Sequence, residues 1–334
     1  MSSSPWKRGG IALGTAVGTA GLAYAVPRLL AAPVRRRREP DGDPLEMPEC
    51  DVNYVESFDG SRLRVLSRGD GPVVLLSHGV LLSAQTWVRQ FRTWPELGYR
   101  VVAFDHRGHG ESTVGASGHA IEHLADDIRV LLARLDLREV TLVGHSMGGF
   151  AVQAFAVRFP ELAREHVRGL VLLSTSARTP LASGLPAARS IMHLIARSGP
   201  DATRVLSRRD LGFAIARMGL GRRPYAAHVE FTRRILTETD PAAARDAVLS
   251  LLDFDLRPDL GRISQPTLVI VGSADILTPP WEARRMARAI PGARYEVVPG
   301  AGHMLMLERA PEFGDLVLGF AADPGAPIGA DQTR

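Results

Sequence analysis

Ser146 is the residue in this chain best placed for nucleophilic chemistry. It lies between Gly144 and Gly148, after the β-branched run 139–143 and before the helix-forming residues 147–158. A serine at a sharp strand-to-helix corner takes strained backbone angles, and glycines on both sides avoid the collisions that side chains would cause. Because a serine hydroxyl is a weak nucleophile at neutral pH, this interpretation requires a histidine base and a carboxylate elsewhere in the chain.

Two later residues meet that requirement. Asp275 and His303 each follow an apolar run of strand length. The carboxyl ends of parallel strands meet at one edge of a sheet, so we expect both side chains to converge on Ser146. The sequence therefore predicts a nucleophile, an orienting acid and a base. Asp253 and Asp255 remain alternative positions for the acid.

The tetrahedral oxyanion of acyl transfer needs two backbone donors. The apolar run 72–77 ends in His78-Gly79, which puts the amide of Val80 near the same edge of the sheet. The amide of Met147 lies in the first turn of the helix expected after the serine, where the helix dipole is positive. We therefore expect Val80 and Met147 to form the oxyanion hole.

Five motifs together carry a resemblance to a known family: His78-Gly79, Asp105-His-Arg-Gly-His-Gly-Glu-Ser112, Gly144-His-Ser-Met-Gly-Gly149, Asp275 and Gly302-His303. Over about residues 50–322 the chain resembles the α/β-hydrolases, in their serine esterase and lipase branch. The resemblance implies an α/β fold with a mostly parallel, eight-stranded sheet, helices on both faces and a helical cap insertion. It also implies a hydrolase that needs no cofactor.

The resemblance implies cleavage of a small-molecule ester or acyl substrate through an acyl-enzyme. The strings around Asp105 and Ser146 are similar to those of monoacylglycerol lipases, so carboxylic esters and monoacylglycerols are the leading substrates. A serine at the strand-to-helix corner argues against epoxide hydrolases and haloalkane dehalogenases. Haloperoxidase-like members usually carry tryptophan at the position of Val80. Acyl thioesterase or acyltransferase activity on the same triad stays open. A noncatalytic ligand-binding homologue is a further alternative, although the complete triad counts against it.

The composition suits a globular chain with a large core, since 45% of the 334 residues are hydrophobic and 23% are charged. The net charge is +4, and all basic residues except Lys7 are arginine. Because no nucleic-acid-binding motif accompanies this charge, we expect no nucleic-acid partner. Cys50 is the only cysteine, which excludes an intramolecular disulfide.

Between the apolar run 72–77 and the motif around Ser146, four histidines are spaced closely enough to suggest a metal site. His106 and His109 have no acidic or cysteine partner at ligand spacing, so a tight, glycine-bearing loop explains them better. His119 and His123 are not part of a recognised zinc motif, so we expect them on a solvated helix face. The sequence therefore predicts no metal.

The N-terminal residues 9–26 are uncharged and rich in alanine and glycine. A helix of this length spans about 27 Å, close to a bilayer core. Arginines are more numerous after this segment than before it, which predicts membrane association through residues 9–34 with a cytoplasmic catalytic domain. A cleaved signal peptide with export of the enzyme and a flexible extension are the alternatives.

Helical periodicity replaces strand-helix alternation over about residues 176–246, which predicts a cap over the serine. This stretch holds 12 arginines against 6 acidic residues. An anionic substrate or carrier, such as an acyl thioester or a lipid headgroup, an anionic membrane leaflet nearby, or an ordinary solvated surface would explain this excess. We expect an apolar anchor or signal segment with a basic linker over 1–48, a hydrolase domain over 49–322 and a disordered tail over 323–334. The substrate-binding residues and the oligomeric state do not follow from the sequence.

Overall fold

The computed structural model describes residues 34–39, 45–179, 190, 193–194, 196–197 and 202–325. Most of the predicted N-terminal segment and of the predicted tail lies outside these residues. Within the described ranges, no helix combines the length and the apolar character needed to cross a bilayer. This finding contradicts the localisation predicted from residues 9–34. Alanine and glycine are only weakly apolar, so a run of them without charges is a poor indicator of a membrane helix.

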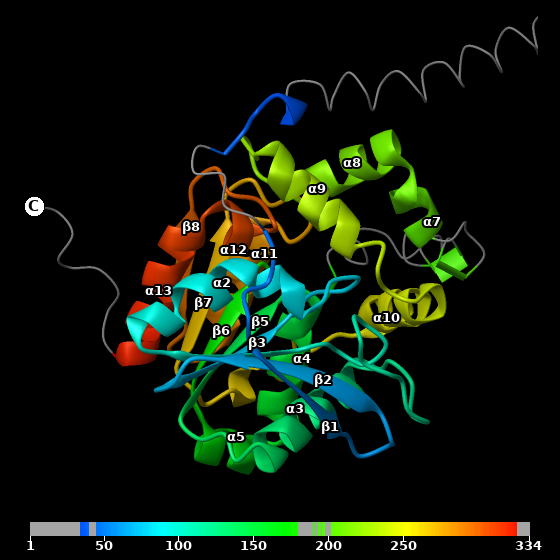
Figure 1. Cartoon of the computed structure of the whole chain (residues 1–334). Helices are drawn as coiled ribbons and strands as arrows, with labels where there is room; N and C mark the ends of the chain where they lie inside the picture. Colours follow the sequence, from blue (N-terminus) through cyan, green and yellow to red (C-terminus); the bar gives the residue numbers. More distant parts are fainter. Residues whose placement is uncertain are drawn as a thin grey trace, which may run out of the picture.

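The core is one eight-stranded sheet with the strand order β1-β2-β4-β3-β5-β6-β7-β8 (Figure 1). β1 (Asp51–Glu56) and β2 (Arg62–Arg68) form an antiparallel hairpin at one edge, and β2 is also antiparallel to β4. All other neighbours are parallel. The predicted mostly parallel α/β sheet is therefore confirmed. The remaining strands are β3 (Val73–Ser77), β4 (Arg100–Phe104), β5 (Val140–His145), β6 (Val167–Leu173), β7 (Thr267–Gly272) and β8 (Arg294–Val298).

Helices cover both faces of the sheet, because successive strand residues point to opposite sides. In β3, Leu75 packs into one hydrophobic cluster, whereas Val74 and Leu76 pack into the other. The Leu75 face is covered by α3 (Ile121–Arg134), α4 (Met147–Arg158), α5 (Pro160–His166) and α11 (Pro280–Ala289). The opposite face is covered by η1 (Ala84–Trp87), α2 (Val88–Thr93), α12 (Leu305–Glu308) and α13 (Ala310–Ala322). Two further short helices are η2 (Pro95–Leu97) and η4 (Leu260–Arg262).

The helix α4 is the most deeply buried helix of the core. Every residue from Met147 to Val157 is buried, and only Arg158 at its last position is exposed. Phe159-Pro160 ends it, since proline has no amide hydrogen to continue the helical bonds. A helix packed on all sides in this way fixes the residue that precedes it, which is Ser146.

Among the described residues between β6 and β7, four cap helices are delimited: α7 (Ala202–Ser207), α8 (Arg209–Met218), α9 (Ala226–Ile235) and α10 (Pro241–Asp253). Figure 1 shows α7, α8 and α9 above the sheet, on the side of α12. The chain leaves helical geometry at Arg208, between α7 and α8. Gly212 lies so close to the end of α7 that a Cβ on it would collide with the carbonyl oxygen of Leu206. The two helices therefore pack closely against each other at the point where the chain is no longer helical.

The predicted basic linker begins as a segment packed on the cap. Val34 is buried, and Arg35 forms an ion pair of 2.7 Å with Asp210 of α8. The carbonyl oxygen of Arg37 accepts a hydrogen bond of 3.0 Å from the amide that starts α9. Glu39 forms an ion pair of 2.7 Å with Arg89 of α2. Residues 34–39 therefore bridge the cap and the core.

Candidate active site

Ser146 occupies a strained corner between β5 and α4. Its φ of 53° and ψ of −117° lie in a region that L-residues rarely adopt. Two contacts hold this backbone: the Ser146 amide donates to the carbonyl oxygen of Leu173 at 3.0 Å, and the hydroxyl of Thr175 donates to the Ser146 carbonyl oxygen at 2.8 Å. Strain of this kind persists only where the surroundings enforce it, and it is concentrated at functional sites.

The two glycines beside the serine leave no room for side chains. A Cβ on Gly144 would lie 2.6 Å from the carbonyl oxygen of Gly148, and a Cβ on Gly148 would collide with the backbone of Ser77. Real Cβ atoms do not approach backbone atoms so closely. The steric requirement that the sequence suggested for these glycines is therefore present in the structure.

His303 and Asp275 meet at the carboxyl edge of the sheet. His303 donates from Nδ1 to Oδ2 of Asp275 at 3.0 Å, and both residues are buried, with 8% and 3% of their surface exposed. Thr278 also donates to Oδ2 from its hydroxyl at 2.8 Å, and its amide donates to Oδ1 at 3.0 Å. Burial alone would raise the pKa of Asp275, but the charge of His303 and these hydrogen bonds together lower that pKa to about 2. The carboxylate is therefore ionised at neutral pH.

The alternative acids lie elsewhere. Asp253 faces His193, with 3.1 Å between its Oδ1 and the ring Nε2. Asp255 forms an ion pair of 2.6 Å with Arg257. Of the three aspartates weighed from the sequence, Asp275 is the one whose carboxylate contacts His303.

His145, the residue before the serine, is hydrogen-bonded to the backbone of His303. Its Nε2 donates to the carbonyl oxygen of His303 at 3.0 Å, and the two ring centroids are 4.8 Å apart. Burial, together with the nearby charge of His303, lowers the pKa of His145 well below its ordinary value. A neutral ring thus holds the backbone of His303 without placing a second charge beside it.

The loop that carries Val80 follows β3 and is held by a buried histidine. His78 donates from Nδ1 to the carbonyl oxygen of Gly79 at 2.8 Å, while its Nε2 accepts from the amide of His106 at 2.9 Å. The other expected oxyanion donor, Met147, is the first residue of α4. Its amide has no intrahelical partner at that position, as is general for the first turn of a helix.

One cavity of about 380 Å³ brings these parts together. It is lined by Ser146, His303 and Val80 from the core and by apolar side chains from the cap, such as those of Ile215 and Leu236. Among the described residues that line it, none is an arginine, lysine, aspartate or glutamate. The arginines of the described part of the cap therefore do not face this cavity.

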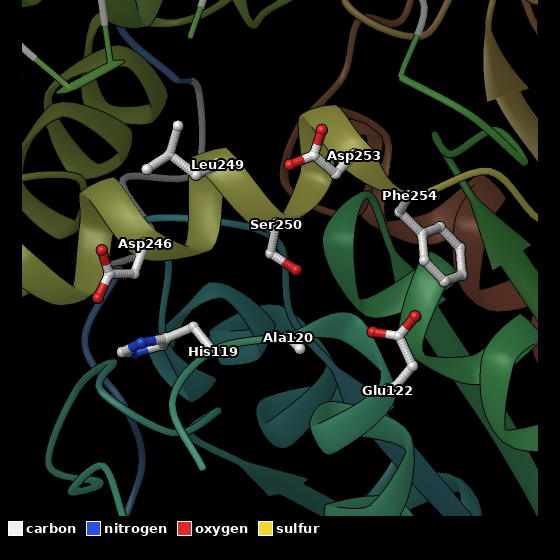
Figure 2. Close-up of a pocket in the computed structure, with 8 residues that line it drawn as sticks. All are labelled: His119, Ala120, Glu122, Asp246, Leu249, Ser250, Asp253 and Phe254. Carbon is white, nitrogen blue, oxygen red and sulfur yellow. The ribbon is translucent and has the colours of Figure 1, made fainter. Parts of the chain in front are cut away.

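A second cavity, of about 430 Å³, lies between α10 and the start of α3 (Figure 2). Its described lining includes His119, Glu122, Asp246 and Asp253, and it contains none of the predicted catalytic residues. His119 is buried and precedes α3, with its ring against Gly108, so the expectation of a solvated helix face is wrong for this residue. Within the described ranges, no group of three or more histidine, cysteine or acidic residues is arranged to hold a metal ion.

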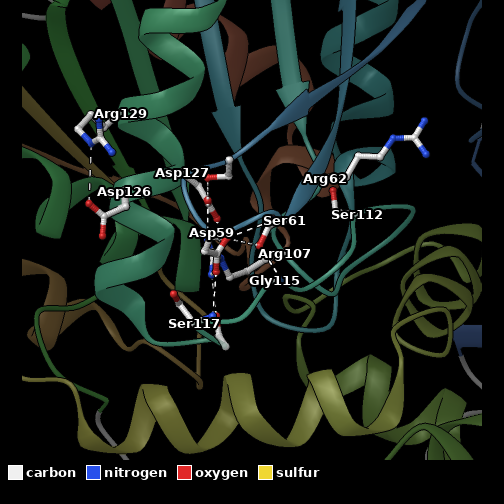
Figure 3. A network of polar contacts seen from close by, with 12 residues as sticks. Asp59, Ser61, Arg62, Arg107, Ser112, Gly115, Ser117, Asp126, Asp127 and Arg129 are labelled. Atoms are coloured by element: carbon white, nitrogen blue, oxygen red, sulfur yellow. Dashed lines mark hydrogen bonds and ion pairs between the residues drawn. The ribbon is translucent and has the colours of Figure 1, made fainter.

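The loop after β4 is fixed by a buried charge network (Figure 3). Arg107 bonds to Asp59 in the β1–β2 turn at 2.8 Å and to Asp127 in α3 at 2.7 Å. Asp105 at the start of this loop accepts from the amide of Ala84 at 2.7 Å. Because Ala84 follows the loop that carries Val80, the hydrogen bond from Ala84 to Asp105 joins the end of that loop to the loop after β4.

Sequence reasoning missed Thr278 and His145, which contact the two predicted partners directly. Thr278 lies three positions after Asp275, whose side chain accepts hydrogen bonds from the amides of Leu277 and Thr278. Aspartates commonly accept from the backbone of their own turn, so this local pattern could have indicated Thr278. His145 gave no such signal, because its partner is far away in the chain and the contact depends on the fold.

The chain is similar to a family profile and to several known proteins. A sequence profile described as alpha/beta hydrolase fold matches residues 72–310. The chain is 30% identical over 265 residues to the non-heme chloroperoxidase CPO-A1 of Kitasatospora aureofaciens, which covers 77% of this chain and 92% of that protein. It is similar to the solved structure of a thermophilic esterase from Thermogutta terrifontis, with a TM-score of 0.69 and 30% identity over 83% of this chain and 100% of that one. An esterase from Exiguobacterium antarcticum gives a TM-score of 0.71 at 23% identity over 80% and 98% of the two chains, which shows the fold.

These relatives support a hydrolase that acts on small molecules. The finer similarity to monoacylglycerol lipases stays a prediction, because the relatives named above are esterases and a chloroperoxidase. The profile match covers more than half of the chain, and the sheet has the expected order of strands. The chain belongs to the α/β-hydrolase fold family.

Proposed function

We propose that the protein is a serine hydrolase that cleaves carboxylic esters through an acyl-enzyme. The observation that supports this most directly is the 3.0 Å hydrogen bond between His303 and Asp275 at a cavity that Ser146 also lines. With Nδ1 of His303 bonded to an ionised carboxylate, Nε2 is the ring nitrogen that can accept a proton from the serine. In this proposal Ser146 is the nucleophile, His303 the base and Asp275 the orienting acid.

The reaction proceeds in two halves. Ser146 Oγ attacks the ester carbonyl carbon while Nε2 of His303 takes the hydroxyl proton, and the amides of Val80 and Met147 stabilise the resulting oxyanion. The intermediate collapses to the acyl-enzyme, and the alcohol leaves with the proton from His303. A water molecule then gives its proton to His303 and attacks the acyl carbon. The serine departs with that proton, and the carboxylic acid is released.

The lining of the cavity supports an uncharged, mainly apolar substrate. No described lining residue is an arginine, lysine, aspartate or glutamate, and a cavity of about 380 Å³ fits a small ligand. Each methylene buried there stabilises binding by about 0.8 kcal/mol. For the basic cap, this lining favours an ordinary solvated surface over an anionic substrate as the explanation.

We also propose that residues 49–322 form the hydrolase domain, with α7 to α10 as its cap. The first strand starts at Asp51 and α13 ends at Ala322, which supports these bounds. The last cap helix runs to Asp253, beyond the predicted end of the cap at 246.

Labelling by a fluorophosphonate tests the proposed nucleophile. We expect the purified wild type to be labelled at one site, and Ser146→Ala and His303→Ala to be labelled not at all or far more slowly while their circular dichroism spectra match the wild type. Absence of labelling of the folded wild type, under conditions in which a known serine esterase reacts, would overturn the serine mechanism.

A panel of acyl donors and acceptors separates the alternatives. We expect p-nitrophenyl esters to turn over with a preference for one range of aliphatic chain length. Faster turnover of matched thioesters would favour a thioesterase, and product transfer to added alcohols would favour an acyltransferase. Because a relative is a chloroperoxidase, hydrogen peroxide belongs in the panel as an acceptor that would release a peracid from the same acyl-enzyme.

A further inference from the structure

The turn that follows α8 is bonded directly to the loop that carries His303. The amides of His303 and Met304 both donate to the carbonyl oxygen of Gly219, at 2.9 and 3.2 Å. In the opposite direction, the amide of Arg222 donates to the carbonyl oxygen of Gly300 at 2.9 Å. Three backbone hydrogen bonds therefore join the cap to the segment that positions the expected base.

The turn after α8 and the loop that carries His303 pack backbone against backbone. A Cβ on Gly221 would collide with the carbonyl oxygen of Gly300, and a Cβ on Gly302 would collide with the amide nitrogen of Gly221. A Cβ on Gly302 would also lie 2.8 Å from the Cα of Leu220. Because no side chain separates the two segments, a displacement of one must displace the other.

The carboxylate of Glu308 is hydrogen-bonded to both of these segments. Glu308, the last residue of α12, accepts from the amide of Gly221 through Oε2 at 2.6 Å and from the amide of Gly302 through Oε1 at 3.0 Å. Burial raises the pKa of Glu308, although these two hydrogen bonds and the charges of Arg217 and Arg309 act in the other direction. Gly302 is adjacent to His303, so one oxygen of this carboxylate holds the residue next to the base.

We propose that Glu308 is a positioning residue that holds His303 in register with the cap by accepting both amides at once. The bridge needs two acceptors, and a carboxylate is the side chain of this size that supplies two. Glutamine would offer one acceptor and would turn an NH₂ group toward the other amide. Glu308 touches no reacting atom in this proposal and acts only through the backbone of Gly302 and Gly221.

The inference rests on the proposed serine mechanism, and the labelling rate of Ser146 tests it. The rate constant for reaction with a small fluorophosphonate depends on His303 as base but hardly on the cap, whereas misfolding lowers the amplitude and not the rate constant. We expect Glu308→Gln to lower this rate constant roughly 10- to 100-fold, since a displacement of about 1 Å at a catalytic group costs on that order. With a short p-nitrophenyl ester, kcat should fall by a similar factor while KM changes little.

Glu312→Gln is the matched control. Glu312 is an exposed glutamate on the neighbouring helix α13 that pairs only loosely with Arg309, at 3.9 Å. We expect this variant to react like the wild type. A Glu308→Gln protein that is labelled at the wild-type rate would overturn the proposal, even if its melting temperature is lower.

Glu308→Asp keeps the test decisive if the glutamine variant does not fold. Its carboxylate retains both acceptors but is shorter by one methylene, so it cannot reach both amides at the same distances. We expect a labelling rate constant several-fold below that of the wild type, and an unchanged rate constant would overturn the proposal. Failure of the wild type itself to react would instead contradict the proposed function, so the two failures are distinguishable.

Discussion

The two walls of the candidate active site are built in opposite ways. On the core side, Ser146 and His303 are held by hydrogen bonds and by contacts that leave no space for a single added carbon. On the cap side, the cavity is lined by aliphatic side chains, and Met218 leaves 56% of its surface exposed. Backbone contacts of the first kind set atomic positions, whereas apolar contacts of the second kind are non-directional. The core side is therefore expected to determine the rate of the chemistry, and the cap side the choice of substrate.

One segment breaks this division. The turn Gly219–Arg222 belongs to the cap by its place in the chain, yet it is bonded to the loop of His303 with the tight backbone contacts of the core. Glu308 reinforces that bond. The two walls therefore differ in the type of contact, tight backbone contacts or apolar side-chain contacts, and not in the stretch of sequence that supplies them. Substitutions on either wall can test this difference.

The largest effect is expected for Asp275→Asn. An asparagine can donate from its amide to Nδ1 of His303, which favours the tautomer with the proton on Nε2 and leaves no acceptor for the serine proton. On this basis kcat should fall roughly 10⁴-fold while the fold persists. Steady-state kinetics with a p-nitrophenyl ester measure the loss. Asp253→Asn is the matched control and should retain wild-type kcat; an equal loss in that variant would mean that the acid has been assigned to the wrong residue.

A smaller but still large effect is expected for Arg107→Ala, which removes the centre of the network in Figure 3. Asp59 and Asp127 would then be left buried without their common partner. Removing one member of a buried ion pair typically costs about 3–5 kcal/mol of unfolding free energy. Urea unfolding measures this loss of unfolding free energy.

Arg138→Ala is the control for Arg107→Ala. Arg138 is 56% exposed and pairs with the exposed Glu165, so its removal should leave the unfolding free energy nearly unchanged. Equal costs for the two substitutions would show that the loop after β4 does not depend on its buried charges.

The parts of the molecule that could be predicted from sequence are those with local causes. Apolar runs of strand length predicted strands of the sheet, and the glycines around Ser146 predicted the corner, because each signal lies within a few residues of the feature it specifies. The order of the strand ends then indicated that Asp275 and His303 would meet.

The parts that could not be predicted depend on contacts between distant residues. His145 holds His303 and Glu308 holds Gly221, and neither pair has a signature in the chain. The break between α7 and α8 required knowledge of how Gly212 packs on Leu206. The localisation was wrong for a different reason: the absence of charge over residues 9–26 was taken as a sign of an apolar segment, although alanine and glycine are only weakly apolar.

Acid should weaken the core side through its buried histidines. Burial lowers the pKa of His109 to about 4, against 6.5 for an ordinary histidine. Between these pH values the unfolded chain binds a proton that the folded chain does not, so the unfolding free energy falls as the pH drops from 6.5 toward 4. The expected loss is about 1.4 kcal/mol per pH unit, or about 3 kcal/mol in total.

His109→Gln should remove that share of the pH dependence. Urea unfolding from pH 7.5 to pH 4.5 measures it, and the comparison is between slopes, so a constant loss of stability in the variant does not affect the result. A variant whose stability falls with the same slope as the wild type would show that His109 gains its proton in the folded state as readily as in the unfolded one.

The smallest effect is expected on the cap side, for Leu236→Ala. Leu236 lines the cavity, and its truncation adds space without touching a hydrogen bond of the catalytic groups. The preferred acyl chain should lengthen, with kcat/KM for the longer ester rising about 10-fold relative to the shorter one, since one methylene in an apolar pocket changes selectivity by at least about that factor. Leu97→Ala is the matched control, because Leu97 is 64% exposed and lies outside this cavity. If Leu236→Ala lowered kcat equally for all chain lengths, the cap would share in the chemistry and the division between the two walls would fail.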